Sequence, residues 1–199
     1  MTNCSKVHAM PHSNRNNSLP TVIVLAAGRS ERFKVASGGQ HKLHTMLQGR
    51  TVLERTLASV QASGLPFHLV TAADMSHIDH AGMGDSIAAG VMATQHASGW
   101  LILPADLPLV LPQTIFAIAL ALATHEVVVP VYAKHRGHPV GFAAVCGAAL
   151  AQLSGDHGAA RVVAQHEAYT VPIDDIGCVL DVDTPEQLAQ ANLVLLQRN

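Results

Sequence analysis

Apolar residues occur along this chain in short uninterrupted runs, separated by segments with helical spacing. The run from Thr21 to Ala27, TVIVLAA, shows no polar alternation. This pattern is typical of a strand that is covered on both faces, as in a parallel sheet. We predict further strands at 67–71, 100–103, 127–131, 139–142, 169–173 and 178–180.

The segments between these runs repeat their apolar residues at intervals of three or four. Thr51 and Glu54 have the spacing of a capping box, and Leu53, Leu57 and Val60 lie at helical intervals beside them. The same kind of pattern, with a proline or glycine at several of its ends, predicts helices at 87–95, after Pro112, at 147–153, after Gly158 and from Pro185 onward.

Strands and helices therefore alternate along the chain. The alternation predicts an α/β fold, a three-layer sandwich with a mostly parallel, Rossmann-like sheet. A loop is expected at 34–41, where Gly38 and Gly39 interrupt the pattern. The first twenty residues are polar and rich in Asn, Ser and His, so we expect a mobile tail at 1–20 and one domain at 21–199.

Composition narrows the class of protein. Of the 199 residues, 49% are apolar and 13% are charged, as in a globular protein. Twelve basic and 14 acidic residues leave a net charge of -2, which predicts no nucleic-acid partner and no membrane partner. No apolar run approaches the ~20 residues that cross a bilayer. Cys4, Cys146 and Cys178 are widely spaced, so we expect free thiols and a cytoplasmic protein.

The 13 histidines raise the alternative of a histidine-based metal protein. They are spread along the chain, without an HExxH motif or a Cys/His cluster. Most are therefore expected in loops or on the surface, and metal analysis of the purified protein would test the alternative.

The first candidate for chemistry follows the first predicted strand. Leu25 to Phe33, LAAGRSERF, combines small residues, which let backbone amides approach a phosphate, with positive charge. The small residues are Ala26, Ala27 and Gly28, and the cations are Arg29, Arg32 and, further on, Lys42. Neither GxGxxG nor GxxxxGK[ST] is present, which counts against a dinucleotide fold and a P-loop kinase. A plain strand-to-helix turn with solvated arginines remains an alternative.

Aspartates follow two later predicted strands. Asp106 lies between two prolines at a strand end, where open α/β sheets bind ligands, and it offers one carboxylate to Mg²⁺. Asp181 and Asp183 also precede a helix and are candidates for the same ion. Each has a structural alternative, a turn aspartate for Asp106 and a helix cap for Asp183. Thr184 is an equally good cap, which would leave Asp183 free to bind metal.

Six segments occur in a characteristic order: LAAGRSERF with HKL, GMGDSIAAGV, LPADLPLV, HRGHPVGF, GDHGAAR and DVDTPEQL. Together they resemble the molybdenum-cofactor nucleotidyltransferases, the molybdopterin cytidylyl- and guanylyltransferase branch of the NTP-transferase superfamily. The resemblance extends from about Val22 to the C-terminal helix. It implies a sheet of the nucleotide-diphospho-sugar transferase type, Mg²⁺ as cofactor, and a molybdoenzyme or its chaperone as protein partner.

The resemblance also implies roles for particular residues. Arg32, Lys42 and Asp106 would be catalytic, and Asp106 and Asp183 would hold Mg²⁺. The acceptor would lie against His138, Pro139 and Arg161. The nucleotide would contact Leu25, Ala26, Ala27, Gly28, Arg29, Ser30, Arg32, Lys42, Gly84, Ser86 and Asp106.

The chain departs from the family pattern in three places. The segment between Phe33 and Lys42 is longer than usual, and the segment between Thr71 and Gly82 is short. An extra alanine in GDHGAAR displaces Arg161.

The implied reaction is transfer of NMP from an NTP to a phosphorylated acceptor, with release of pyrophosphate. Molybdopterin is the first acceptor to consider, with CTP ahead of GTP, because LAAG and GMGDS are closer to the cytidylyl type. A sugar phosphate or phospho-acid is the alternative acceptor. A nucleotide-binding regulatory or chaperone module without catalysis is the alternative from another class.

Overall fold

The computed structural model describes residues 19–198. The predicted tail at 1–20 lies outside the described residues, except for Leu19 and Pro20, and so does Cys4. A seven-stranded sheet has the order β4-β1-β5-β8-β6-β7, and β9 also pairs with β6. Its strands are β1 (Thr21–Ala26), β4 (Phe67–Thr71), β5 (Gly99–Pro104), β6 (Val127–Tyr132), β7 (His135–Arg136), β8 (Val140–Ala143) and β9 (Tyr169–Pro172).

The strands β4, β1 and β5 are parallel neighbours. Strand β8 is antiparallel to both β5 and β6, so β6 runs in the direction of β5, and β9 is parallel to β6. Only β7 and β8 run the other way among the strands of this sheet in residues 19–198. The predicted α/β fold with a mostly parallel sheet is confirmed, and the structure adds that the sheet is mixed.

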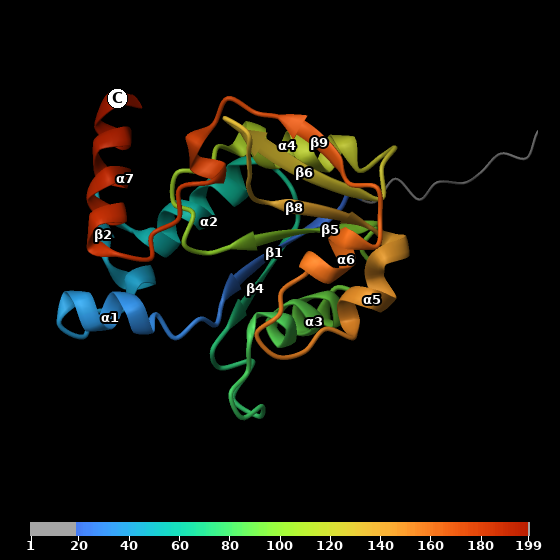
Figure 1. The fold of residues 1–199 in the computed structure, drawn as a ribbon, viewed down its shortest axis with the longest axis horizontal. Coiled ribbons are helices and arrows are strands. Elements are labelled where there is room, and N and C mark those ends of the chain that lie inside the picture. The colour runs from blue at the N-terminus through green and yellow to red at the C-terminus, as the bar shows by residue number, and fades with distance from the viewer. Residues whose placement is uncertain (1–18, 199) are drawn as a thin grey trace, which may run out of the picture.

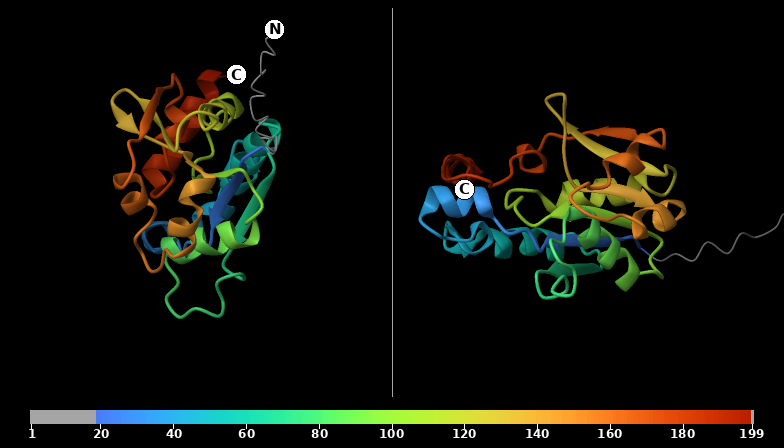
Figure 2. Two further views of the ribbon diagram at one scale, coloured as in Figure 1. Left: turned by 90° about the vertical axis from the view of Figure 1, so that its right-hand side faces the viewer. Right: turned by 60° about the horizontal axis from the view of Figure 1, so that its bottom comes forward.

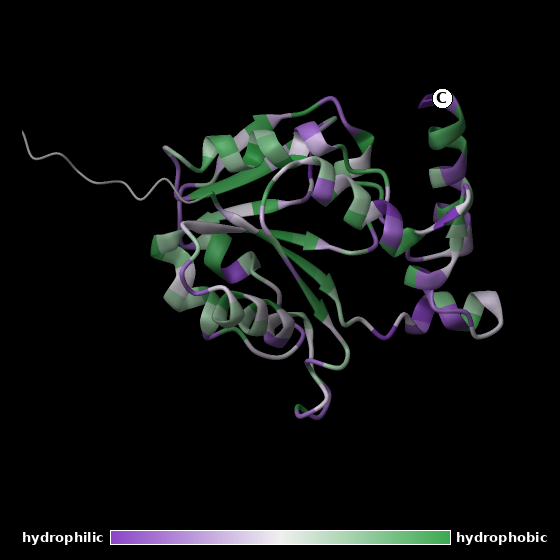
Figure 3. Ribbon diagram, turned by 180° about the vertical axis from the view of Figure 1, so that it is seen from behind, coloured by the Kyte–Doolittle hydropathy of each residue, from purple (hydrophilic) through white to green (hydrophobic). Residues whose placement is uncertain are grey.

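Helices cover both faces of the sheet (Figure 1). Val22 and Val24 of β1 enter one hydrophobic core, whereas Ile23 between them enters the other, as a doubly covered strand requires. The first core includes residues of α2 (Val52–Ala62), α4 (Pro112–Ala121) and α7 (Pro185–Arg198), and the second includes residues of α3 (Met83–Ala93), α5 (Gly147–Ala151) and α6 (Ala160–Ala164). Figure 3 shows hydrophobic residues concentrated along the central strands.

Helix α7 lies beside α1 (Glu31–Ser37), beyond the carboxyl end of β1 (Figures 1 and 2). Its position matters because α7 is preceded directly by the Asp181–Asp183 segment. The chain after the last strand therefore returns to the edge of the sheet at which β1 and β5 end.

The predicted helix at Thr51 has the expected cap. The Thr51 hydroxyl accepts a hydrogen bond from the Glu54 amide at 3.2 Å, and the Glu54 carboxylate accepts one from the Thr51 amide at 2.7 Å. Gly64 follows the end of α2 and has a φ of 73°. Glycine is favoured at this position because it adopts the left-handed conformation at little steric cost. The capping box read from the sequence is confirmed.

Two local predictions were wrong. Residues 34–41 are not a loop throughout, because α1 extends to Ser37 and ends at Gly38, whose φ of 71° terminates the helix. The buried side chain of Phe33 anchors this short helix to the core. Residues 178–180 form no strand. Cys178 ends the 3₁₀ helix η3 (Ile176–Cys178), whose first turn is capped by Asp175.

Other short elements went unpredicted. Strands β2 (Met46–Leu47) and β3 (Arg50–Thr51) form a small hairpin, and the 3₁₀ helices η1 (Lys42–His44) and η2 (Ala144–Cys146) lie in connections.

Within residues 19–198 no helix is long and apolar enough to cross a membrane. Cys146 and Cys178 are buried free thiols, as predicted for them.

Candidate active site

The candidate site lies where β1 and β5 end side by side. Leu25 pairs with Pro104 in the parallel register, and the Leu25 carbonyl accepts a hydrogen bond from the Ala105 amide at 3.0 Å. The loop after β1 and the Asp106 loop after β5 therefore leave the sheet together. Adjacent parallel strands place their carboxyl-end loops at one edge, which is where open α/β sheets bind ligands.

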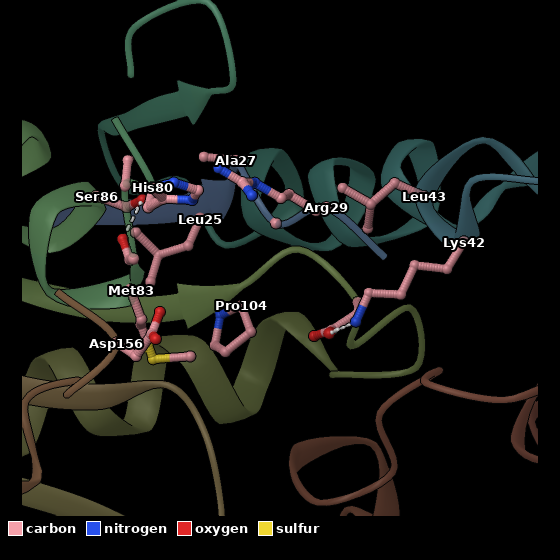
Figure 4. Close-up of a pocket in the computed structure, with 14 residues that line it drawn as sticks. Leu25, Ala27, Arg29, Lys42, Leu43, His80, Met83, Ser86, Pro104 and Asp156 are labelled. Carbon is pink, nitrogen blue, oxygen red and sulfur yellow. Dashed lines mark hydrogen bonds and ion pairs between the residues drawn. The ribbon is translucent and has the colours of Figure 1, made fainter. Parts of the chain in front are cut away.

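A cavity of about 420 Å³ opens at this edge (Figure 4). It is lined by Leu25, Ala27, Gly28, Arg29, Lys42, Leu43, His80, Ala81, Gly82, Met83, Ser86, Pro104, Asp106 and Asp156. A second cavity of about 140 Å³, lined by Ser30, Glu31, Arg32, Phe33, Lys42 and Asp183, shares Lys42 with the first. The larger volume is within the usual range for small-molecule sites.

Figure 4 shows the two ends of the larger cavity apart. Lys42 and Leu43 lie at one end, which we call the lysine end. Asp106 belongs to this end because it accepts a hydrogen bond from Lys42. Ser86, His80, Met83 and Asp156 lie at the other, which we call the α3 end because Met83 and Ser86 belong to that helix. Arg29 lies between them.

The lysine end is a cluster of charged side chains from three distant segments. Lys42 Nζ donates to Asp106 Oδ2 at 2.5 Å and also to Asp183 Oδ1, while Arg32 donates to Asp183 Oδ2. The side chains of Lys42, Asp106 and Asp183 are 13%, 15% and 16% exposed, whereas that of Arg32 is 79% exposed. The structure thus brings together the predicted charged residues, although Arg32 remains largely in solvent.

Burial and charge act in opposite directions on Lys42. Burial alone lowers the pKa of an ammonium group, but the Asp106 and Asp183 carboxylates more than offset it, so the pKa of Lys42 is raised from 10.5. Lys42 therefore remains protonated in the physiological range. A permanently charged ammonium group at the edge of a cavity is suited to binding a polyanion.

Asp183 does not cap α7. The Gln187 amide donates to the Thr184 hydroxyl at 3.3 Å, and the Gln187 side chain accepts from the Asp183 amide at 2.9 Å. Thr184 is therefore the cap, which resolves the alternative left open by the sequence. The Asp183 carboxylate is free for Lys42 and Arg32.

The segment before α7 is attached to the Asp106 loop. The Val182 amide donates to the Asp106 carbonyl at 2.9 Å, which holds the two loops side by side. Asp181 accepts from the Gln187 side chain at 2.9 Å instead of joining Lys42. Burial raises the pKa of Asp181, and the nearby charges of Asp183 and Asp106 raise it further.

Asp106 retains an unused acceptor. Its Oδ1 atom is buried and has no hydrogen-bond partner in the described part of the chain. A buried carboxylate oxygen without a partner is costly, and such an atom is usually satisfied by a ligand, an ion or water. Across residues 19–198, no group of three or more His, Cys, Asp or Glu side chains is arranged to hold a metal.

The loop after β1 is fixed by a histidine that the sequence reasoning missed. His41 Nε2 lies 3.1 Å from the Gly28 carbonyl and 3.2 Å from the Ser30 hydroxyl. Burial is the main cause that lowers the pKa of His41, which favours its neutral form. Ser30 adopts φ 57°, so this contact holds a backbone conformation that side chains rarely take. No local sequence pattern reveals the pairing of His41 with the loop.

His138, predicted on the acceptor side, lies near Asp106. Burial lowers the pKa of His138, although the backbone of Ile102 and the charge of Asp106 act the other way. Its Nδ1 atom is buried without a hydrogen-bond partner among the described residues, and its amide donates to the Cys178 carbonyl at 2.8 Å. Pro139 is buried beside it. Neither residue lines the larger cavity.

Of the remaining residues that were predicted to bind the nucleotide or the acceptor, some line a cavity and others do not. Leu25, Ala27, Gly28, Arg29 and Ser86 line the larger cavity, and Ser30 lines the smaller one. Ala26, Gly84 and Arg161 line neither. Gly84 instead packs on the backbone of residues 154–157, and Arg161 is exposed on α6.

The sequence reasoning assigned no role to seven of the lining residues, namely Leu43, His80, Ala81, Gly82, Met83, Pro104 and Asp156. All of them except His80 and Ala81 lie within the quoted segments HKL, GMGDSIAAGV, LPADLPLV and GDHGAAR. Their position beside recognised motif residues was the available signal.

The chain is similar to known proteins over most of its length. Residues 22–169 match the model of the MobA-like NTP transferase domain. The purine catabolism protein PucB of Bacillus subtilis (strain 168) is 28% identical over 194 residues, which cover 83% of this chain and 92% of PucB.

Solved structures are also similar. Rv0371c from Mycobacterium tuberculosis H37Rv is 28% identical, with a TM-score of 0.73 over 88% of this chain and 99% of that one. Its complex with manganese aligns with 26% identity, a TM-score of 0.68 and the same coverage. A nucleotidyl transferase from Methanothermobacter has the same fold, with a TM-score of 0.74 over 91% of this chain and 99% of that one at 21% identity.

Proposed function

Because the chain belongs to the family of MobA-like NTP transferase domains, and is thus a nucleotidyltransferase, we propose that it transfers NMP from CTP or GTP to a phosphorylated acceptor. Molybdopterin is the proposed acceptor, and CTP is the proposed first nucleotide. The observation that supports this most is the Lys42–Asp106–Asp183 cluster at the mouth of a cavity of about 420 Å³.

The proposed reaction is an in-line displacement at phosphorus. An oxygen of the acceptor phosphate forms a bond to the α-phosphorus of the NTP, and the bond from that phosphorus to the bridging oxygen of the β-phosphate breaks. Pyrophosphate leaves with the electron pair. A phosphate monoester is already anionic near neutral pH, so no general base is required. Catalysis then depends on alignment and on neutralising charge.

Positive side chains at the lysine end supply that neutralisation. Lys42 is protonated and held in one place by two carboxylates, so it costs little reorganisation when it meets a phosphate. Arg29 lines the cavity and Arg32 lines the adjoining one. Gly28 has open space where a side chain would be, which lets a phosphate approach the backbone of the loop.

Asp106 and Asp183 are the residues that would hold a divalent cation. They already share one cation, the Lys42 ammonium, and Asp106 Oδ1 is left without a partner in residues 19–198. Two carboxylates together with substrate phosphates are the usual ligands of Mg²⁺. When bound, such an ion neutralises phosphate charge and polarises phosphoryl oxygens. The manganese complex of Rv0371c supports a divalent ion, and Mg²⁺ is our proposal.

His138 and Pro139 are proposed on the acceptor side. Burial favours the neutral imidazole of His138, and its buried Nδ1 atom has no hydrogen-bond partner within residues 19–198, so we propose that it bonds with an acceptor group. Arg161, which is exposed on α6, is proposed as a further contact of the acceptor.

Pyrophosphate release is the decisive measurement. The full chain is incubated with CTP, GTP, ATP or UTP, with Mg²⁺ or Mn²⁺, and with molybdopterin or a panel of sugar phosphates and phospho-acids. We expect release with CTP and molybdopterin, and none without acceptor or after chelation of the metal. Release only with a sugar phosphate or phospho-acid would replace the proposed acceptor, and NTP binding without release on any acceptor would favour a non-catalytic module.

A further inference from the structure

The α3 end of the cavity is built from two segments that are far apart in the sequence. Gly82, Met83 and Ser86 come from the start of α3, while Asp156 comes from the connection between α5 and α6. The connection has no regular secondary structure at Asp156, so its position depends on what it contacts.

One carboxylate oxygen joins the two segments. Asp85 Oδ2 accepts a hydrogen bond from the Gly82 amide at 2.8 Å and another from the Gly155 amide at 2.9 Å. The first bond lies within the start of α3, and the second reaches the connection that contains Asp156. Asp85 is therefore the side chain that attaches the start of α3 to the connection between α5 and α6.

The backbones approach closely around this bridge. The Gly84 amide donates to the Gly155 carbonyl at 2.8 Å. A Cβ atom on Gly82 would lie 2.2 Å from the Gly155 carbonyl carbon, and one on Gly84 would lie 2.8 Å from the Ser154 carbonyl oxygen. Both glycines are thus required for contact between the segments, and the carboxylate of Asp85 is added at that contact.

Charge indicates which part of a nucleotide faces this end. Asp85 satisfies the amide at the start of α3, so the positive end of the helix already has its anion. Asp156 adds a second carboxylate that lines the cavity. A triphosphate is repelled here and attracted to Lys42 and Arg29, which leaves the α3 end for the nucleoside.

We propose that Asp85 is a positioning residue for nucleoside binding, which holds residues 154–158 against α3 so that Met83 and Asp156 form one wall. The inference rests on the proposed function, because it takes an NTP as the ligand. Asp85 itself does not line the cavity. Its effect is transmitted through the bond to Gly155.

Binding measurements test the inference without turnover. The dissociation constants of CTP, GTP and inorganic tripolyphosphate are measured by calorimetry on the full chain and on Asp85→Ala. We expect Asp85→Ala to weaken NTP binding roughly tenfold or more, since small displacements of a binding group have large effects. Tripolyphosphate, which has no nucleoside, should bind as it does to the unchanged protein.

Two further variants separate the bridge from general stability. Asp85→Asn keeps an oxygen that accepts both amides, so it should restore most of the NTP affinity. Glu54→Ala removes a comparable capping carboxylate from α2, which does not line the cavity, and should leave NTP affinity unchanged. If Asp85→Ala does not fold, Asp85→Glu takes its place, because Glu also caps a helix but moves the oxygen away from Gly155.

Three results would overturn the inference. NTP affinity that stays within twofold in Asp85→Ala shows that the bridge is not needed. An equal loss of NTP and tripolyphosphate binding shows a general defect of the fold. Weak NTP binding by Asp85→Asn, equal to that of Asp85→Ala, shows that the charge and not the bridge matters. An unchanged protein that binds no NTP contradicts the proposed function itself, before any variant is compared.

Discussion

The two ends of the cavity are held together in different ways. At the lysine end, charged side chains from three segments meet directly, with Lys42 between Asp106 and Asp183. At the α3 end, backbones meet through glycines, and one carboxylate, Asp85, accepts two amides. The first arrangement leaves charged groups facing the ligand, whereas Asp85, the carboxylate that joins the second, does not line the cavity. Substitutions should therefore affect chemistry at one end, and affinity or stability at the other.

The largest effect is expected at the lysine end, for Asp106→Ala. The variant loses a partner of Lys42 and a proposed metal ligand, so pyrophosphate release should fall about a thousandfold, or about 4 kcal/mol in transition-state stabilisation. Circular dichroism should show an unchanged fold. The matched control is Asp174→Ala, an exposed aspartate outside both cavities, which should keep full activity. Near-normal turnover by Asp106→Ala would remove this residue from the catalytic set.

A buried carboxylate outside both cavities, that of Asp175, should matter for stability instead. Asp175 accepts two backbone amides, the Thr114 hydroxyl at 2.7 Å and the Arg198 guanidinium at 2.9 Å. Asp175→Ala leaves these donors unpaired, so the free energy of unfolding in urea should fall by about 3 kcal/mol. Asp174→Ala is again the control. An unchanged unfolding midpoint for Asp175→Ala would mean that the segment leading to Asp183 does not depend on this residue.

Two glycines compare a packing contact at the start of α3 with a residue that lines the cavity. Gly84→Ala places a Cβ atom 2.8 Å from two backbone oxygens, so we expect a loss of about 2 kcal/mol in unfolding free energy. Gly28→Ala meets nothing within 4 Å, so its stability should be unchanged and only phosphate binding should weaken. Urea unfolding and tripolyphosphate binding measure the two effects. Equal stability losses in both variants would contradict the distinction between a packing glycine and a ligand-facing one.

This comparison also shows what the sequence alone predicts. Asp106 was identified because residue type indicates chemistry and because strand ends converge at one edge of a parallel sheet. Lys42 and Asp183 were identified by residue type within the quoted segments, since the strand expected before Asp183 does not form. The strand pattern was recognisable for the same reason, since burial on both faces requires a continuous apolar run such as Val22 to Val24. Local pattern and local chemistry were sufficient for these features.

Features that depend on tertiary contact were not predictable in this way. Asp85 and Gly155 are 70 positions apart, and nothing in either segment indicates that they meet. His41 and Gly28 are paired only because α1 returns the chain to the loop. The missing strand at 178–180 has a similar cause, because Gly177 packs on the Leu109 carbonyl and the backbone bends there.

Alkaline pH should lower the stability of the fold. Burial raises the pKa of the Cys178 thiol to about 11, and the charge of Asp175 adds to it. The folded chain keeps this proton between pH 9 and 11 while the unfolded chain loses it, so stability is complete below pH 9 and falls as pH rises. The expected loss is about 1.4 kcal/mol at pH 10. Unfolding free energy should fall less steeply over this range in Cys178→Ala, and equal slopes would exclude the thiol.

The smallest expected effect tests which residue at the start of α7 caps the helix and which one acts in the active site. Thr184→Ala removes the hydroxyl that accepts the Gln187 amide, so the free energy of unfolding should fall by about 1 kcal/mol, with pyrophosphate release unchanged. Asp183→Ala should do the reverse, because its carboxylate bonds with Lys42 and Arg32 and makes no capping bond. Its loss should therefore lower activity while helix stability is retained. If Thr184→Ala lost activity and Asp183→Ala lost only stability, Asp183 would be a structural cap and the lysine end would keep a single carboxylate for the metal.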